Sequence, residues 1–140
     1  MLVGCAHSRE NIRKILPEDI LRERALHPQA EVMVHPECIP AVTALADQII
    51  STGGMCKYAK ESRVQEFIVG TEIGLLHRLR QENPEKKFYP ASELAICPNM
   101  KRINLEKVLW ALQDMKYEIK VPEDIRLKAK ATVDRMLALV

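Results

Sequence analysis

The chain has 140 residues, of which 47% are hydrophobic and 29% charged, with a formal net charge of +2 at pH 7. This balance is typical of a globular domain with one apolar core. The 21 Lys and Arg residues are interleaved with 19 Asp and Glu, and only 4% of residues are aromatic. These values exclude a polybasic arm with base-stacking rings, so we expect no nucleic-acid partner.

The chain also lacks the patterns of export and membrane insertion. Its N-terminus has no basic start and reaches charged residues too soon for a secretory signal, and no apolar run approaches the roughly 18 residues of a membrane span. We therefore expect a cytoplasmic protein with no membrane partner. In that reducing compartment Cys5, Cys38, Cys56 and Cys97 are expected to be thiols, cofactor ligands or core residues rather than disulfides. None forms a Cys-x-x-Cys pair.

Helix and strand signals alternate along the first part of the chain. A charged helix begins at Pro17, where proline suits the first turn, and closes before His27. Residues 30–34 are predicted as a buried strand. A second helix is predicted from Pro40 through residue 50, because apolar residues recur there at helical spacing, and Ser51-Thr52-Gly53-Gly54 ends it.

The same alternation continues towards residue 96. A short helix is predicted through residues 58–60, then a strand over residues 66–70, a helix over residues 72–80 and a short strand at residues 88–89. This order predicts an α/β fold, a small parallel sheet with helices on both faces. After residue 97 two amphipathic helices are predicted, with apolar stripes over residues 105–115 and 125–137. These stripes should lack part of their packing partners in this chain.

An imidazole and a carboxylate follow the first predicted strand, in the stretch His35-Pro36-Glu37-Cys38. Parallel sheets bind ligands in the loops at the carboxyl ends of their strands. Pro36 stops the strand and stiffens the turn, so His35 and Glu37 could bind or protonate a ligand there. The alternative is that His35 only bonds the backbone and Glu37 is solvated.

Two hydroxyls and two glycines between predicted helices form a candidate anion site. The backbone N–H groups of Gly53 and Gly54, with the hydroxyls of Ser51 and Thr52, suit a phosphate or carboxylate at a helix N-terminus. The alternative is a glycine C-cap followed by a Ser/Thr N-cap.

The cysteines are expected to play different parts. Cys97 precedes Pro98 at an element boundary, a pattern typical of iron-sulfur ligands. Cys38 and Cys56 are expected to be buried packing residues, and His77 to be solvated or capping.

Six stretches in this order and spacing resemble quinolinate synthases: His35-Pro36-Glu37-Cys38, Ser51-Thr52-Gly53-Gly54-Met55, Tyr58-Ala59-Lys60-Glu61, Phe67-Ile68-Val69-Gly70-Thr71-Glu72, Phe88-Tyr89-Pro90-Ala91 and Cys97-Pro98-Asn99-Met100-Lys101. The resemblance runs from about Ile15 to the end and corresponds to the C-terminal part of that family. It implies an enzyme of NAD biosynthesis that condenses iminoaspartate with dihydroxyacetone phosphate to quinolinate, using a 4Fe-4S cluster.

The resemblance also implies roles for single residues. Cys97 would be one of three cysteine ligands, one from each of three similar α/β domains, which leave one iron open to the substrate as a Lewis acid. His35 and Glu37 would be substrate-contacting acid/base groups. Ser51 and Thr52 would donate to a substrate carboxylate or phosphate.

The chain departs from the family at its N-terminal side. The family's chain is more than twice as long, so this chain is expected to lack the N-terminal domains or to obtain them from a second chain. A Cys-x-x-His motif expected before Ile15 is replaced by Arg9 and Ile12, and Cys5-Ala6-His7 has the wrong spacing. We therefore expect an atypical segment over residues 1–14, an α/β domain like the family's third domain over 15–96, and a helical segment over 97–140 that in the family packs on the first domain.

Three hypotheses follow. The chain is part of a quinolinate synthase that is inactive alone, or a non-catalytic anion-binding α/β module, or a partner fragment that completes itself on another chain.

Overall fold

The computed structural model describes residues 12–139, so Cys5, His7 and Arg9 lie outside the described residues. The chain forms two compact units, one up to Arg102 and one from Ile103 onwards. Cys97 therefore belongs to the first unit.

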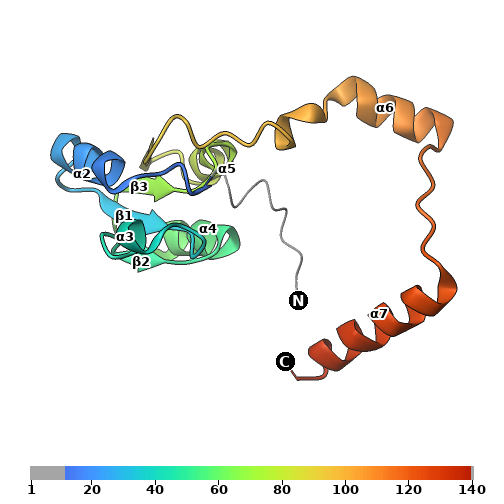
Figure 1. Ribbon diagram of the computed structural model, residues 1–140. Helices are drawn as coiled ribbons and strands as arrows, with labels where there is room; N and C mark the ends of the chain where they lie inside the picture. The colour runs from blue at the N-terminus through green and yellow to red at the C-terminus, as the bar shows by residue number, and fades with distance from the viewer. Residues whose placement is uncertain (1–11, 140) are drawn as a thin grey trace. The chain divides into compact units, whose positions relative to one another are not determined.

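The first unit is built on a four-stranded parallel sheet (Figure 1). Its strands are β1 (Glu31–Val34), β2 (Gln48–Ile49), β3 (Glu66–Gly70) and β4 (Lys87–Pro90), in the order β2-β1-β3-β4. Val34 pairs with Ile49 on one side and with Gly70 on the other. The carboxyl ends of these three strands therefore meet at one edge of the sheet.

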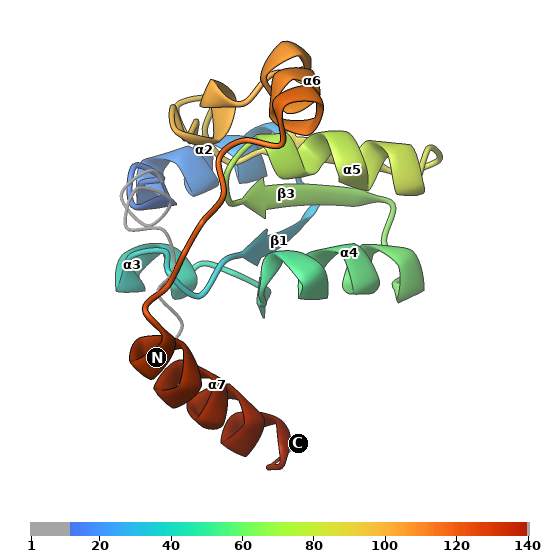
Figure 2. The ribbon, with the colours of Figure 1, turned by 90° about the vertical axis from the view of Figure 1, so that its right-hand side faces the viewer.

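Helices cover both faces of the sheet, which confirms the predicted α/β fold (Figure 2). On one face α2 (Pro17–Leu26) and α3 (Pro40–Thr43) contribute Ile20 and Val42 to a cluster with Val32, Val34 and Ile68. On the other face α4 (Thr52–Glu61) and α5 (Gly74–Glu82) pack on the alternate strand residues, including Met33, Phe67 and Val69. Successive side chains of a strand point to opposite faces of the sheet, so each strand contributes residues to both clusters.

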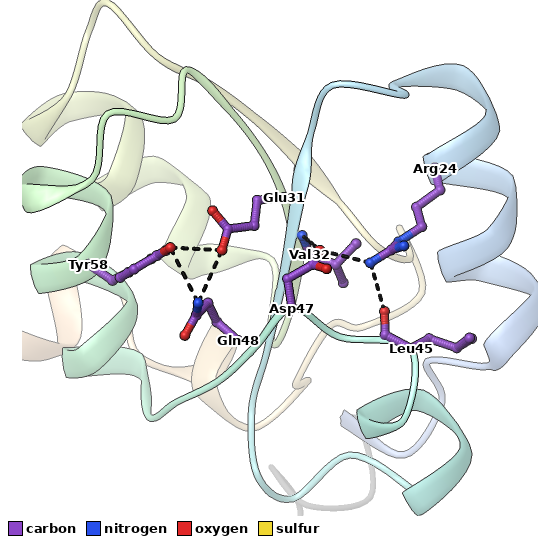
Figure 3. Close-up of polar contacts among 7 residues, drawn as sticks. All are labelled: Arg24, Glu31, Val32, Leu45, Asp47, Gln48 and Tyr58. Carbon is purple, nitrogen blue, oxygen red and sulfur yellow. Dashed lines mark hydrogen bonds and ion pairs between the residues drawn. The ribbon is translucent and has the colours of Figure 1, made fainter.

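The predicted helix over residues 40–50 is wrong. Only α3 is helical, and residues 48–49 form β2. Asp47 explains the difference, because its carboxylate accepts hydrogen bonds from the Val32 N–H group and from Arg24 Nη2, both at 2.7 Å (Figure 3). Its own N–H group donates to Val32 O at 2.9 Å. These bonds to β1 replace the helical bonds that would continue α3.

A second polar group fixes the amino end of β1 against β2 and α4. The Glu31 carboxylate accepts from Tyr58 Oη at 2.7 Å and from Gln48 Nε2 at 3.1 Å (Figure 3). The bond to Glu31 raises the pKa of the Tyr58 hydroxyl above its usual value. Polar contacts thus tie the amino end of β1 to β2 and α4.

The second unit contains α6 (Leu105–Asp114) and α7 (Glu123–Leu137), which confirms the two predicted tail helices. Every described residue from 103 to 139 is exposed, including Leu105 at 86% and Trp110 at 58%. The apolar stripes of α6 and α7 are therefore not buried against each other within this unit. Within residues 12–139, none of the helices combines the length and the apolar character needed to cross a membrane.

Candidate active site

The turn after β1 holds His35 and Glu37 side by side. The His35 N–H group donates to Gly70 O at 2.9 Å, and the Cys38 N–H group donates back to His35 O at 3.0 Å. The Glu37 N–H group donates to His35 Nδ1 at 3.2 Å, and Glu37 Oε2 lies 3.9 Å from the same nitrogen. Since Nδ1 accepts, the neutral ring carries its proton on Nε2 and can donate it to a ligand.

The loop after β2 ends in the N-cap of α4. Ser51 Oγ accepts the Gly54 N–H group at 3.2 Å, and Ser51 O accepts the Met55 N–H group at 2.8 Å. Helix geometry leaves the first N–H groups, those of Thr52 and Gly53, without an intrahelical acceptor. A Cβ on Gly53 would meet nothing within 4 Å, so open space lies beside this turn. The N-cap alternative is thus correct for Ser51, while the C-cap of that alternative is absent because the strand β2, and not a helix, directly precedes this turn.

Two buried polar residues directly follow the strand β3. Thr71 is 2% exposed and Glu72 is 7% exposed. Glu72 Oε2 accepts the Gly74 N–H group at 2.7 Å, and Glu72 Oε1 lies 3.3 Å from Lys101 Nζ. Burial of a carboxylate is costly unless it is hydrogen-bonded or paired, and Glu72 is both.

These three loops open onto one cavity of about 580 Å³, within the usual range of ligand pockets. Three of the predicted site residues line it: His35, Glu37 and Thr52. Ser51 is not among the lining residues, because its hydroxyl caps α4. The other lining residues are Ile12, Thr71, Glu72, Gly74, Leu75, Arg78, Met100 and Lys101.

Four polar members of this cavity were not predicted from the sequence: Thr71, Glu72, Arg78 and Lys101. The first two directly follow a parallel strand, so the rule that selects His35 also selects them. Arg78 lies one residue from His77 on α5, and its Nε donates to Glu82 at 2.6 Å. Nothing in the local sequence distinguishes it from a solvated helical arginine.

The cysteines of the described region are all buried. Burial raises the pKa of the Cys38 thiol to about 11, so this thiol stays protonated and packs in the core, as expected. Cys56 is buried on α4, also as expected. Cys97 is 0% exposed, and its N–H group donates to Glu72 Oε1 at 3.4 Å. It therefore lies beside the cavity wall rather than on its surface.

Within residues 12–139, no three or more His, Cys, Asp or Glu side chains are grouped to hold a metal ion. Cys97 supplies a soft sulfur donor, which suits an iron-sulfur cluster, but one thiol does not complete such a site. The described residues thus offer one ligand that suits an iron-sulfur cluster, but not the complete set of ligands that a cluster needs.

A family model described as "Quinolinate synthetase A protein" matches residues 7–138. The chain belongs to the quinolinate synthetase A family. This match includes residues 7–14, part of the segment over residues 1–14 that was expected to be atypical. All residues that line the cavity lie within this match.

Several quinolinate synthases are similar to the chain over most of its length. The protein of Thermodesulfovibrio yellowstonii is 55% identical over 126 residues, which is 90% of this chain and 42% of that protein. The protein of Methanosarcina barkeri is 52% identical over 90% of this chain and 41% of its own length. "Quinolinate synthase 2" of Methanosarcina acetivorans is 48% identical over 97% of this chain and 43% of its own length. The chain thus spans about two fifths of the length of these relatives.

Proposed function

We propose that this chain forms the C-terminal part of a quinolinate synthase, a cytoplasmic transferase of NAD biosynthesis. Its substrates would be iminoaspartate and dihydroxyacetone phosphate. The observation that supports this is the convergence of His35, Glu37 and Thr52 from two strand ends on one cavity, in a chain of the quinolinate synthetase A family. Residues 15–96 would correspond to the family's third domain, and residues 97–140 to the segment that packs on its first domain.

The chemistry of the cavity suits two anionic substrates. Lys101 and Arg78 bring positive charge to the cavity, where they are paired with Glu72 and Glu82. Thr52 supplies a hydroxyl next to the open N-terminus of α4. A helix N-terminus favours carboxylates and phosphates because its N–H groups point at the ligand. Ser51 would act here through the turn that it caps, rather than as a lining donor.

His35 and Glu37 would move protons in the condensation. With its proton on Nε2, His35 can donate a hydrogen bond to a substrate oxygen, while Glu37, a half-buried carboxylate, can accept a proton. Glu37 Oε2 lies 3.9 Å from His35 Nδ1, so a proton acceptor and a proton donor stand on one turn beside the same cavity. Dehydration and ring closure both require proton transfers.

The 4Fe-4S cluster remains part of the proposal, with Cys97 as one ligand and the other cysteines from outside the described residues. When bound with one iron open, such a cluster would act as a Lewis acid on a substrate oxygen. The remaining domains, on the same or a second polypeptide, would supply the other ligands. We call the assembly of this chain with those domains the reconstituted enzyme.

A second candidate is a non-catalytic anion-binding module. It is favoured by one observation, the absence of a complete metal-ligand group within residues 12–139. The two candidates differ in the reconstituted enzyme: a quinolinate synthase would hold a cluster and form product, whereas an anion-binding module would do neither.

Product formation and cluster content separate the two candidates. The purified 140-residue chain, treated anaerobically with iron and sulfide, is expected to make no quinolinate, because Cys97 is the one thiol that the proposal assigns to the cluster and one thiol cannot hold four irons. The reconstituted enzyme is expected to contain about four irons per chain and to make quinolinate from iminoaspartate and dihydroxyacetone phosphate. Chromatographic detection of quinolinate and iron analysis measure both. A reconstituted assembly with neither iron nor product would leave the anion-binding module as the function.

A further inference from the structure

The segment that joins β4 to the second unit is docked on the carboxyl end of β3. The Ile73 N–H group donates to Ala95 O at 3.1 Å, which fixes the middle of this segment. Further on, the Lys101 N–H group donates to Pro98 O at 3.2 Å and closes a turn. Between these two points lies Cys97. We call residues 95–101 the docked segment.

Glu72 contacts the docked segment at two places. Its Oε1 accepts the Cys97 N–H group at 3.4 Å and lies 3.3 Å from Lys101 Nζ. Its Oε2 accepts the Gly74 N–H group at 2.7 Å, which fixes the carboxylate to the start of α5. One buried side chain thus joins the sheet to both Cys97 and Lys101.

The contacts require a carboxylate and no other group. Both oxygens of Glu72 accept from donors, and a glutamine amide would set its NH2 group against one of them. The position of Gly74 leaves no room for a side chain beside this ion pair. A Cβ there would lie 2.6 Å from Glu72 Oε2 and 3.1 Å from Lys101 Nζ. The space and the donors around Glu72 are therefore matched to its charged form.

We propose that Glu72 is a positioning residue, which holds Cys97 sheltered and Lys101 at the cavity wall. The importance of this role for catalysis rests on the proposed function, in which Cys97 is a cluster ligand and Lys101 faces the substrates. The docking itself does not depend on that function. A buried thiol reacts only when its segment opens locally, so loss of the Glu72 contacts makes Cys97 accessible more often.

The test is the rate at which iodoacetamide alkylates Cys38, Cys56 and Cys97 in the 140-residue chain, resolved by peptide mass spectrometry. Glu72→Gln is expected to accelerate alkylation of Cys97 about tenfold or more, since hydrogen bonds to a charged group are lost. Cys38 and Cys56 lie in the two core clusters and are expected to keep their rates. Selective acceleration at Cys97 distinguishes release of the docked segment from general loosening of the fold.

The matched control is Glu93→Gln, which removes an exposed carboxylate between β4 and the docked segment and should leave all three rates unchanged. If Glu72→Gln does not fold, Lys101→Met removes only the half-exposed partner and is expected to accelerate the same thiol less. An unchanged Cys97 rate, or equal acceleration of all three cysteines, would overturn the proposal. Alkylation needs neither substrate nor cluster, so its outcome is separate from that of the product assay for the proposed function.

Discussion

In the reconstituted enzyme, His35→Ala and Glu37→Gln are each expected to lower the turnover number by about a hundredfold to ten-thousandfold. Both side chains line the cavity, and the Nε2–H group of His35 is directed by the bond that its Nδ1 accepts from Glu37 N–H. Glu37→Gln keeps that backbone bond and removes only the charge and the proton acceptor. Iron content and visible absorbance should remain those of the wild type. Steady-state quinolinate formation measures the loss.

Two cysteine variants provide the contrast. Cys97→Ser exchanges a soft thiolate for a hard, weakly acidic hydroxyl, so the cluster and its brown colour should be lost together with turnover. Cys38→Ala, within the same turn as His35, should retain the cluster and most activity, because that thiol is buried and protonated. Full turnover in His35→Ala would show that this turn only ends a strand. Loss of iron in Cys38→Ala with retention in Cys97→Ser would identify the other thiol as the ligand.

Lys86→Met is expected to lower the free energy of unfolding of the 140-residue chain by about 2 to 4 kcal/mol. Lys86 is 9% exposed, and its Nζ donates to Ala59 O and to Ser62 O, both at 2.6 Å. These carbonyls lie at the C-terminal end of α4, where helical bonding stops. Methionine fills a similar volume but donates no hydrogen bond, so two carbonyls lose a charged donor. Urea unfolding followed by circular dichroism gives the difference.

The control for Lys86→Met is Lys60→Met, an exposed lysine on α4. It should change the free energy of unfolding by less than about 0.5 kcal/mol, as is usual for surface substitutions. Equal stabilities of Lys86→Met and Lys60→Met would mean that water replaces Lys86 at both carbonyls and that the C-terminus of α4 needs no buried cap.

The carboxyl ends of β1 and β3 could be predicted from the sequence, and with the first of them two of the residues that line the cavity. Short apolar runs identified β1 and β3, and the rule for parallel sheets then selected His35 and Glu37. The same rule applied to Thr71 and Glu72 would have extended the site. These signals are local, because each polar residue directly follows its strand.

The errors arose where contacts distant in sequence decide the structure. Residues 40–50 have helical periodicity, yet Asp47 bonds β1 and the chain turns into β2. In the same way Lys86 looks like a solvated lysine beside Lys87, but it reaches the end of α4. A local sequence pattern does not show that a charged side chain makes a hydrogen bond to a backbone group far away in the sequence.

The burial of Cys97 is a similar case. Proline after cysteine indicated a ligand, but only the folded chain shows that the thiol is covered and that Glu72 holds its N–H group. The spacing of the two residues in the sequence contains no such information.

The most direct test of the cavity as the substrate site is calorimetry of quinolinate binding to the reconstituted enzyme with Thr52→Val. Valine has nearly the volume of threonine, so α4 should fold as before, whereas loss of the hydroxyl should weaken binding by about 1 to 3 kcal/mol. Thr132→Val on α7 is the matched control and should bind as the wild type does. Unchanged affinity in Thr52→Val, or an equal loss in Thr132→Val, would contradict the assignment of the cavity between β1, β2 and β3 as the place where this family's product is bound.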